Sequence, residues 1–315
     1  MALSRYGPKI RDFETELNGY YPTISDTRLS RFKRKMIRIM AGLHCSGSTS
    51  SLKFRASKNQ NMTWPDSSIL TNLQVRGYPT AGDILFEEKY IFIRSLENRI
   101  YTDEELIRLP DISPEHCHYK EWQIRKCSAR RLIQYLTSKQ RHLEILEIGC
   151  GNGWLSHQLA GIPDTKVTGL DINFTELHQA ARVFNGDPNL RFVQGDIRSG
   201  ILQDQLFDCI LFAASIQYFP SLKKIVYFCL SQLKPDGEIH IMDTFFYRRR
   251  EIEGAKRRTA AYYSSLGDLE MADFYFHHCI DDWLSFHYRI LFRPYTLMNR
   301  IRGGKDPFPW IMIKK

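Results

Sequence analysis

The stretch LEIGCGNGWLS, from Leu146 to Ser156, places three glycines at alternate positions between two apolar segments. The apolar run before the glycines is typical of a short buried strand, and WLS starts a helical pattern after them. A strand that passes through glycines into a helix brings its backbone close to a tight turn, a phosphate or a nucleotide. The spacing of the glycines and the acidic residue before them distinguish among these alternatives.

A dinucleotide-binding loop has the spacing G-x-G-x-x-G, which here would require glycine at position 154. Trp154 occupies that position, and Gly149, Gly151 and Gly153 instead make G-x-G-x-G. Glu147, two residues before the first glycine, adds a negative charge that would repel a pyrophosphate. The loop therefore favours a ligand without phosphate groups.

Outward from this loop, short apolar runs alternate with helical segments. Asn173 and Glu176 are expected to cap one of the helices, and the turn KPDG at 234–237 precedes the last of five strands. The expected strands are 143–149, 166–172, 190–197, 207–214 and 238–246, and the expected helices are 154–161, 174–184 and 221–233. Strands joined by helical crossovers at this spacing predict a doubly wound α/β sheet.

Ligands of such a sheet bind beyond the carboxyl ends of its strands. The polar residues that end successive strands are the loop from Glu147 to Gly153, then Asp171, then Asp196, and the segment from Ala213 to Tyr218. Asp171 lies 22 positions after Gly149, about where an acidic residue meets a ribose in dinucleotide folds. These residues are therefore expected to surround one nucleoside-like ligand.

Four motifs in order, LEIGCGNG, VTGLDIN, VQGDI and FDCILFAASIQYF followed by LKPDGEIHIMD, resemble the class I S-adenosylmethionine-dependent methyltransferases. The resemblance covers about residues 113–245 and is nearest to the group that includes quinone-ring and other small-molecule methyltransferases. It implies a Rossmann-like α/β sheet of seven strands whose last pair is antiparallel. HYRILF at 287–292 and PFPWIMIK at 307–314 are the candidates for that pair.

The resemblance also implies S-adenosyl-L-methionine as the cofactor and assigns residues to its parts. The glycine loop with Glu147 would line the methionine end, Asp171 would bind the ribose hydroxyls, Asp196 and the Ile197 backbone would bind adenine, and Ala213 would lie under the donor. Two ordinary alternatives stay open, because Gly153 could serve only helix packing and Asp196 could only cap a turn. The expected cofactor-binding residues are Glu147, Gly149, Cys150, Gly151, Asn152, Gly153, Asp171, Ile172, Asp196, Ile197 and Ala213.

No catalytic residue is assigned from the sequence. The methyl group is already activated by the sulfonium, so holding nucleophile, carbon and sulfur in line can supply most of the catalysis. A base is needed only for a protonated acceptor, and the candidates are Asp243, His277, His278 and Tyr218. No metal is expected, because the neighbours in the run from His116 to His118 would point about 100° apart on a helix.

Two features of the sequence limit the class of acceptor molecule: motifs of other methyltransferase classes are missing, and an aromatic cap is expected at about 246–288. The loop AASIQYF lacks both the Asn/Asp-Pro-Pro-aromatic motif typical of base-amine methylation and the Pro-Cys of cytosine-C5 enzymes. Ten aromatic residues between Phe245 and Phe286, with Tyr119 and Trp122, could roof an apolar pocket. We expect O-, N- or C-methylation of a small aromatic or lipophilic molecule. The alternatives are an RNA or protein methyltransferase, and a non-catalytic regulator that binds the donor.

Charge and composition suggest three parts. Residues 1–60 hold 12 Lys/Arg against 4 Asp/Glu, whereas the other 255 residues hold 32 against 31. Residues 28–43 make a basic amphipathic helix that could pack internally or contact an anionic membrane or RNA. A small accessory α/β unit is expected at 61–112, with strands at 84–94 and 99–101 and a helix capped by Thr102 and Glu105. The methyltransferase domain, 113–315, opens with a helix from Ser113 to about Thr137.

The seven cysteines are scattered and form no C-x-x-C pair, which predicts reduced thiols. The N-terminus does not resemble a leader, and no apolar run approaches about 20 residues, so we expect a cytoplasmic location. The oligomeric state is not predicted.

Overall fold

The computed structural model describes residues 71–75, 80–294, 296 and 306–315. The predicted basic helix at 28–43 lies outside the described residues. Within them, no helix is both long and apolar enough to cross a membrane.

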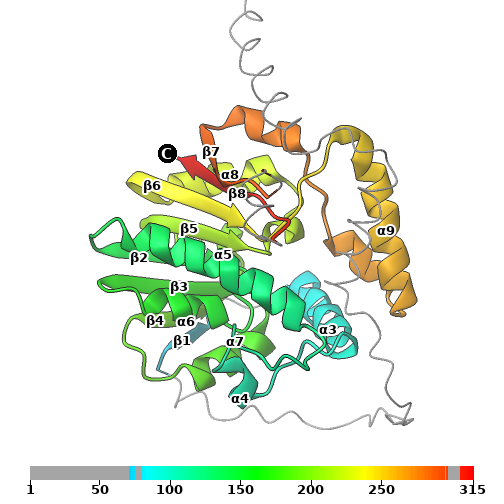
Figure 1. Ribbon diagram of the computed structural model, residues 1–315, viewed down its shortest axis with the longest axis horizontal. Coiled ribbons are helices and arrows are strands. Elements are labelled where there is room, and N and C mark those ends of the chain that lie inside the picture. Colours follow the sequence, from blue (N-terminus) through cyan, green and yellow to red (C-terminus); the bar gives the residue numbers. More distant parts are fainter. Residues whose placement is uncertain (1–70, 76–79, 295, 297–305) are drawn as a thin grey trace, which may run out of the picture.

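An eight-stranded sheet runs through the centre of the molecule in the order β1-β4-β3-β2-β5-β6-β8-β7 (Figure 1). Neighbouring strands from β1 to β6 are parallel, and β8 pairs antiparallel with both β6 and β7. The antiparallel pair predicted near the C-terminus is therefore confirmed, while β1 adds an eighth strand to the predicted seven. The strands are β1 (Leu73–Val75), β2 (Leu143–Ile148), β3 (Thr165–Asp171), β4 (Leu190–Gln194), β5 (Phe207–Ala213), β6 (Leu233–Met242), β7 (Tyr288–Phe292) and β8 (Trp310–Lys314).

Helices cover both faces of the sheet, as a doubly wound fold requires. One core cluster joins the sheet to α5, α6 and α7, and a second joins its other face to α8 and the 3-10 helix η6. The helices are α3 (Ala81–Leu96), α4 (Asp103–Leu106), α5 (Tyr119–Thr137), α6 (Trp154–Ala160), α7 (Phe174–Val183), α8 (Leu222–Ser231) and α9 (Ile252–Ser265). The 3-10 helices are η2 (Ile197–Ser199), η3 (Ile216–Tyr218), η4 (Arg249–Glu251), η5 (Leu269–Phe274) and η6 (Ile280–Ser285).

The central strand β2 explains why its sequence reads as an almost unbroken apolar run. Leu143 and Ile145 belong to the core cluster on one face, whereas Leu146 and Ile148 belong to the cluster on the other. Because successive side chains of a strand point to opposite faces, a strand covered on both sides carries apolar residues on both faces, and Glu144 and Glu147 are the exceptions in β2. This burial fixes β2 and aims its carboxyl end, with the glycine loop, at one edge of the sheet.

The strands predicted at 84–94 and 99–101 are wrong. Residues 81–96 form α3, which begins with a capping box in which Asp83 N donates to Thr80 Oγ1 and Thr80 N donates to Asp83 Oδ2. Phe86, Tyr90 and Ile93 repeat at helical spacing and pack together in one apolar cluster. The apparent alternation of this segment thus belongs to a helix.

Two further predictions concern helix starts. The capping box predicted for Thr102 and Glu105 is confirmed at α4. The helix predicted to begin at Ser113 begins at Tyr119, so its predicted start is wrong, although its end at Thr137 is confirmed. The Ser113 hydroxyl hydrogen-bonds to the Glu115 carboxylate two residues on, within a turn, instead of capping α5.

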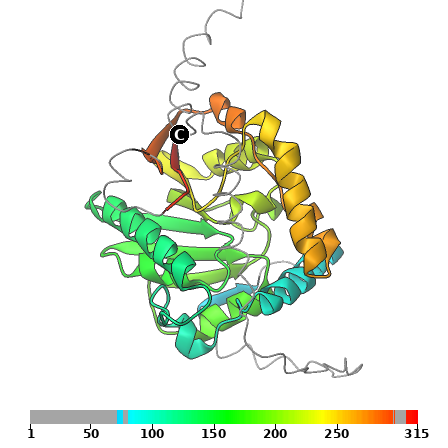
Figure 2. The same cartoon turned by 45° about the vertical axis from the view of Figure 1, so that its right-hand side comes forward.

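At the carboxyl edge of the sheet, α3 and the segment after β6 lie side by side (Figures 1 and 2). Tyr263 of α9 and Met271 of η5 pack with Ile93 of α3 in the same apolar cluster. Lys89 of α3 also forms an ion pair with Asp268, 3.1 Å away. Together these elements build a wall opposite the strand ends. The division into three parts stays a prediction.

Candidate functional site

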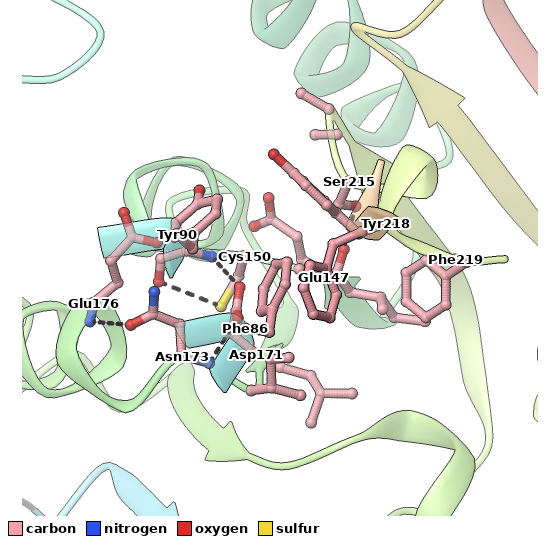
Figure 3. Close-up of a pocket in the computed structure, with 18 of the residues that line it drawn as sticks. Phe86, Tyr90, Glu147, Cys150, Asp171, Asn173, Glu176, Ser215, Tyr218 and Phe219 are labelled. Atoms are coloured by element: carbon pink, nitrogen blue, oxygen red, sulfur yellow. Dashed lines mark hydrogen bonds between the residues drawn. The ribbon is translucent and has the colours of Figure 1, made fainter. Parts of the chain in front are cut away.

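A cavity of about 450 Å³ lies at the carboxyl ends of β2, β3, β4 and β5 (Figure 3). Residues of α3 and η5 also line it. Figure 3 shows Asn173 and Glu176 toward one side of this cavity and Tyr218 and Phe219 toward the other. Ten of the eleven residues predicted to bind the cofactor line the cavity: Glu147, Gly149, Cys150, Gly151, Asn152, Asp171, Ile172, Asp196, Ile197 and Ala213. Gly153 is the exception among them.

The glycine loop depends on backbone angles that other residues rarely adopt. Gly149 has φ +72° and Gly151 has φ +54°, both in the left-handed region. A Cβ atom at Gly149 would lie 2.5 Å from the Cβ of Ser215, so the loop also passes too close to the end of β5 for a side chain. Glycine here lets the loop pack against the segment that follows β5.

Gly153 has a packing role. It precedes α6 with φ +72°, and a Cβ atom there would lie 2.6 Å from Cε1 of Phe192 and 3.0 Å from Cβ of Ala180. The position lets α6 approach β4 and α7. The structure therefore places Gly153 where the packing alternative needs it and not on the cavity wall.

Asp171, at the end of β3, holds the loop. Its Oδ2 accepts a hydrogen bond from Gly151 N at 2.7 Å, and its Oδ1 accepts one from Asn173 N at 2.9 Å. Burial raises the pKa of Asp171, although these backbone donors oppose the shift. Each carboxylate oxygen retains a second lone pair for a ligand hydroxyl group.

Asp196 caps a turn, which is one of the two alternatives that the sequence left open, and it also lines the cavity. Its Oδ1 accepts from Arg198 N at 2.8 Å and so caps η2, and its Oδ2 accepts from Arg198 Nε at 2.8 Å. The same residue lines the cavity, beside Ile197, which is buried. A turn-capping carboxylate and a cavity wall thus coincide at the end of β4.

Glu147 is a buried carboxyl group with a single side-chain hydrogen bond. It is 2% exposed, and Ser156 Oγ of α6 donates to its Oε2 at 2.5 Å. Burial raises the pKa of Glu147 to about 8, and the nearby charge of Asp171 adds to the shift, although the Ser156 hydrogen bond opposes it. A cation in the cavity would stabilise the ionised form of Glu147.

The sequence did not indicate Glu176 as a cavity residue, only as part of a helix cap. Asn173 caps α7 as predicted, since Glu176 N donates to Asn173 Oδ1 at 3.0 Å, while the Glu176 side chain lines the cavity. Burial raises its pKa to about 7, against the nearby charge of Arg94. Phe86 and Tyr90 of α3 were missed for another reason, namely that α3 was predicted as a strand.

Three arginines that the sequence did not indicate also line the cavity, and an ion-pair network holds them. Arg99 contacts Glu97 through Nε at 3.0 Å and Glu121 through Nη2 at 2.6 Å, and Arg125 contacts Glu121 at 3.0 Å. Arg94 contacts Glu97 at 3.6 Å. Glu121 is buried, but these guanidinium groups hold its pKa low, at about 2. The wall of the cavity therefore contains both carboxylate and guanidinium groups.

A second cavity, of about 140 Å³, adjoins the first. The residues that line both cavities are Tyr90, Arg94, Arg99, Arg125, Ala214 and Tyr218. Phe245, Tyr247, Tyr262, Tyr263 and Tyr275 give the second cavity its aromatic wall. Phe274, Phe276 and Trp122 line the first cavity, whereas Phe246 and Trp283 pack on each other in the core.

Of the four candidate bases, the structure brings only Tyr218 to a cavity wall. Asp243 is buried and accepts a hydrogen bond from Ser128 Oγ at 3.0 Å. His277 contacts Thr259 at 2.9 Å, and His278 is bonded to the Ile216 carbonyl at 2.9 Å. Burial raises the pKa of Tyr218, so its phenol stays protonated near neutral pH.

Comparisons with known proteins agree with the arrangement of the strands and loops. Residues 145–237 match the family model of a methyltransferase domain. Over 147 residues the chain is 27% identical to malonyl-[acyl-carrier protein] O-methyltransferase of Halalkalibacterium halodurans, covering 44% of this chain and 54% of the relative. Over 156 residues it is 23% identical to sterol 24-C-methyltransferase of Debaryomyces hansenii, covering 48% of this chain and 41% of that relative. The chain thus spans about half the length of the curated relatives it matches.

Among solved structures, magnesium protoporphyrin IX methyltransferase from Synechocystis PCC 6803, with bound S-adenosylmethionine, aligns with a TM-score of 0.48 and 12% identity. That alignment covers 76% of this chain and all of the other. The family-model match coincides with the glycine loop and the acidic strand ends that line the cavity. Residues 145–237 therefore match a methyltransferase domain, in agreement with the resemblance to the class I S-adenosylmethionine-dependent family.

Proposed function

We propose that the chain is an S-adenosylmethionine-dependent methyltransferase that acts on a small aromatic or lipophilic acceptor, at oxygen, nitrogen or carbon. The observation that carries this proposal is the pair of adjoining cavities. One is walled by the glycine loop and by carboxylates, the other is walled by aromatic rings, and they share Ala214 and Tyr218.

The first cavity fits S-adenosylmethionine by the charge of its walls. Glu147, Asp171 and Glu176 would disfavour phosphate but favour a ligand with an ammonium and a sulfonium. Arg94 and Arg99, which line the same cavity, suit the carboxylate of its methionine part. Gly149 lets the loop pass close to Ser215, where a Cβ atom would clash. These features are consistent with the predicted roles of the loop, Asp171 and Asp196.

The bound donor supplies a methyl group activated by positive sulfur. The residues of this chain would bind and orient the two partners and exclude water, and such positioning can supply most of the acceleration. Tyr218, a neutral phenol at the boundary of the cavities, can donate a hydrogen bond to the acceptor. It does not suit the role of general base, because its raised pKa keeps it protonated.

The names of the curated relatives support a small acceptor, since they include malonyl-[acyl-carrier protein], a sterol and trans-aconitate. Two alternatives remain part of the test. Recruitment of RNA, protein or an anionic membrane would involve residues 28–43, outside the described residues. A donor-binding regulator without turnover is the other alternative. The cytoplasmic location stays a prediction.

Donor binding and acceptor class can be tested separately. Calorimetry with S-adenosylhomocysteine should show binding to the full chain and weaker binding to Asp171→Asn. Incubation with methyl-labelled donor and a cell extract, followed by fractionation, should then place the label in small molecules. Label in RNA or protein would contradict the acceptor part of the proposal. Binding without any label would support the regulator instead.

A further inference from the structure

We propose that the second cavity binds the acceptor and selects an aromatic molecule that carries a carboxylate, which pairs with Arg258 of α9. This inference rests on the proposed methyl transfer and names its substrate class. The size of the cavity, its positive charge, and Arg258, which has no recorded ion-pair partner among the described residues, support it.

The position of the second cavity suits an acceptor. Ala214 and Tyr218, after β5, line both cavities, so a molecule in the second reaches the first at these residues. The volume of about 140 Å³ admits a single-ring molecule rather than a polymer. Methyl transfer between the two ligands would then occur at the shared wall.

The wall of the second cavity is aromatic on the side of the cap. One face of α9 presents Ala255, Arg258, Thr259 and Tyr262 to it, at the spacing of a single helical face. Tyr275 contributes another ring beyond η5. Flat aromatic surfaces favour a ring-shaped ligand through stacked or edge-on contacts.

The charge of the second cavity is positive. Its charged lining consists of four arginines and two glutamates. Glu97 pairs with Arg94 and Arg99 and also accepts a hydrogen bond from the Tyr262 hydroxyl. The network therefore occupies both glutamates and leaves the cavity two positive charges in excess. An acceptor with a negative charge would balance part of this excess.

Arg258 is the cationic residue that this network does not include. Its Nε is buried without a hydrogen-bond partner, and within the described residues no carboxylate is recorded as its ion-pair partner. His277 cannot act as a second cation for a carboxylate, because burial and the nearby charge of Arg258 lower its pKa to about 4 and leave it neutral near pH 7. A buried guanidinium edge of this kind is the preferred partner of a planar carboxylate.

The test compares 4-hydroxybenzoate with 4-hydroxybenzamide, two molecules of nearly the same shape that differ in charge. Binding to the full chain saturated with S-adenosylhomocysteine is measured by ligand-observed NMR titration. The unmodified protein should bind the benzoate at least about tenfold more tightly than the amide. Arg258→Gln should remove this preference, and Arg258→Lys should restore part of it.

Arg257→Gln is the matched control, because Arg257 is the neighbouring, exposed arginine of α9 and its loss changes the net charge equally. It should keep the preference for the benzoate. Equal affinity for both molecules, binding of neither, or a preference that survives in Arg258→Gln would overturn the inference. Failure of S-adenosylhomocysteine to bind the unmodified protein would instead overturn the proposed function. Arg258→Lys keeps the test decisive if Arg258→Gln does not fold.

Discussion

Replacing Glu147 by glutamine should stabilise the ligand-free protein at neutral pH while weakening donor binding. The carboxyl group of Glu147 is 2% exposed, and burial raises its pKa to about 8. Glutamine has nearly the same shape, and its side-chain oxygen can still accept the hydrogen bond from Ser156. The variant therefore removes the titration of the group with little change in packing.

The magnitude follows from the difference between folded and unfolded pKa values. The unfolded chain releases the proton near pH 4.5, whereas the folded protein holds it up to about pH 8. Between these values the folded state binds more protons, so stability falls as the pH rises. Each pH unit costs up to about 1.4 kcal/mol, which gives an upper limit of about 3 kcal/mol at pH 7. Relaxation around the carboxylate lowers this, and we expect about 1–3 kcal/mol, or about 3–9 °C in melting temperature.

Thermal melts of the unmodified protein and Glu147→Gln across about pH 5 to 8 would measure this effect. The two melting temperatures should be similar at the acidic end and separate in favour of the variant toward pH 8. Titration calorimetry should show at least about tenfold weaker binding of S-adenosylmethionine to the variant, since a buried charge partner of the cation is lost. A difference in melting temperature that does not change with pH would refute the reasoning.

Three further substitutions, together with the control Gly161→Ala, test other residues that line the first cavity. Gly149→Ala should cost about 1–3 kcal/mol and weaken S-adenosylhomocysteine binding, because its methyl group would lie 2.5 Å from Cβ of Ser215. Gly161→Ala, at φ −73°, should stay within about 0.5 kcal/mol in the same melts. Asp171→Asn should bind S-adenosylhomocysteine about tenfold more weakly by calorimetry, since an amide cannot accept from both backbone donors; equal affinity would contradict this. Burial raises the pKa of Glu176 to about 7, so affinity for S-adenosylmethionine should rise from about pH 5.5 to about pH 7.5, and Glu176→Gln should flatten that rise.

The donor half of the site was predictable because its signals are local. The strands β2, β3 and β4 each end at, or within two residues of, a predicted glycine or carboxylate, namely Gly149, Asp171 and Asp196. The capping of α7 by Asn173 is likewise contained in a few adjacent residues. Such short patterns follow from strand burial and turn chemistry, so they can be recognised in the sequence without knowledge of the tertiary structure.

The helix α3 was not predicted, although its signal was present. The segment from Ile84 to Arg94 contains apolar residues at both strand and helix spacing, so its periodicity is ambiguous. The capping box of Thr80 and Asp83 was the feature that could have decided it. In contrast, β1 has only three residues, and its pairing with β4 depends on a contact about 120 residues away.

The acceptor half of the site depends on such long-range contacts throughout. Arg99 pairs with Glu121, and Tyr262 hydrogen-bonds to Glu97, 165 residues earlier. Arg258 reaches the same cavity as Tyr90 only because the cap after β6 packs on α3. The family-model match spans 145–237, so most residues of the second cavity lie outside it. The match therefore informs on the donor, whereas the acceptor must be inferred from residues at 90–125 and 245–275 that only the folded chain brings together.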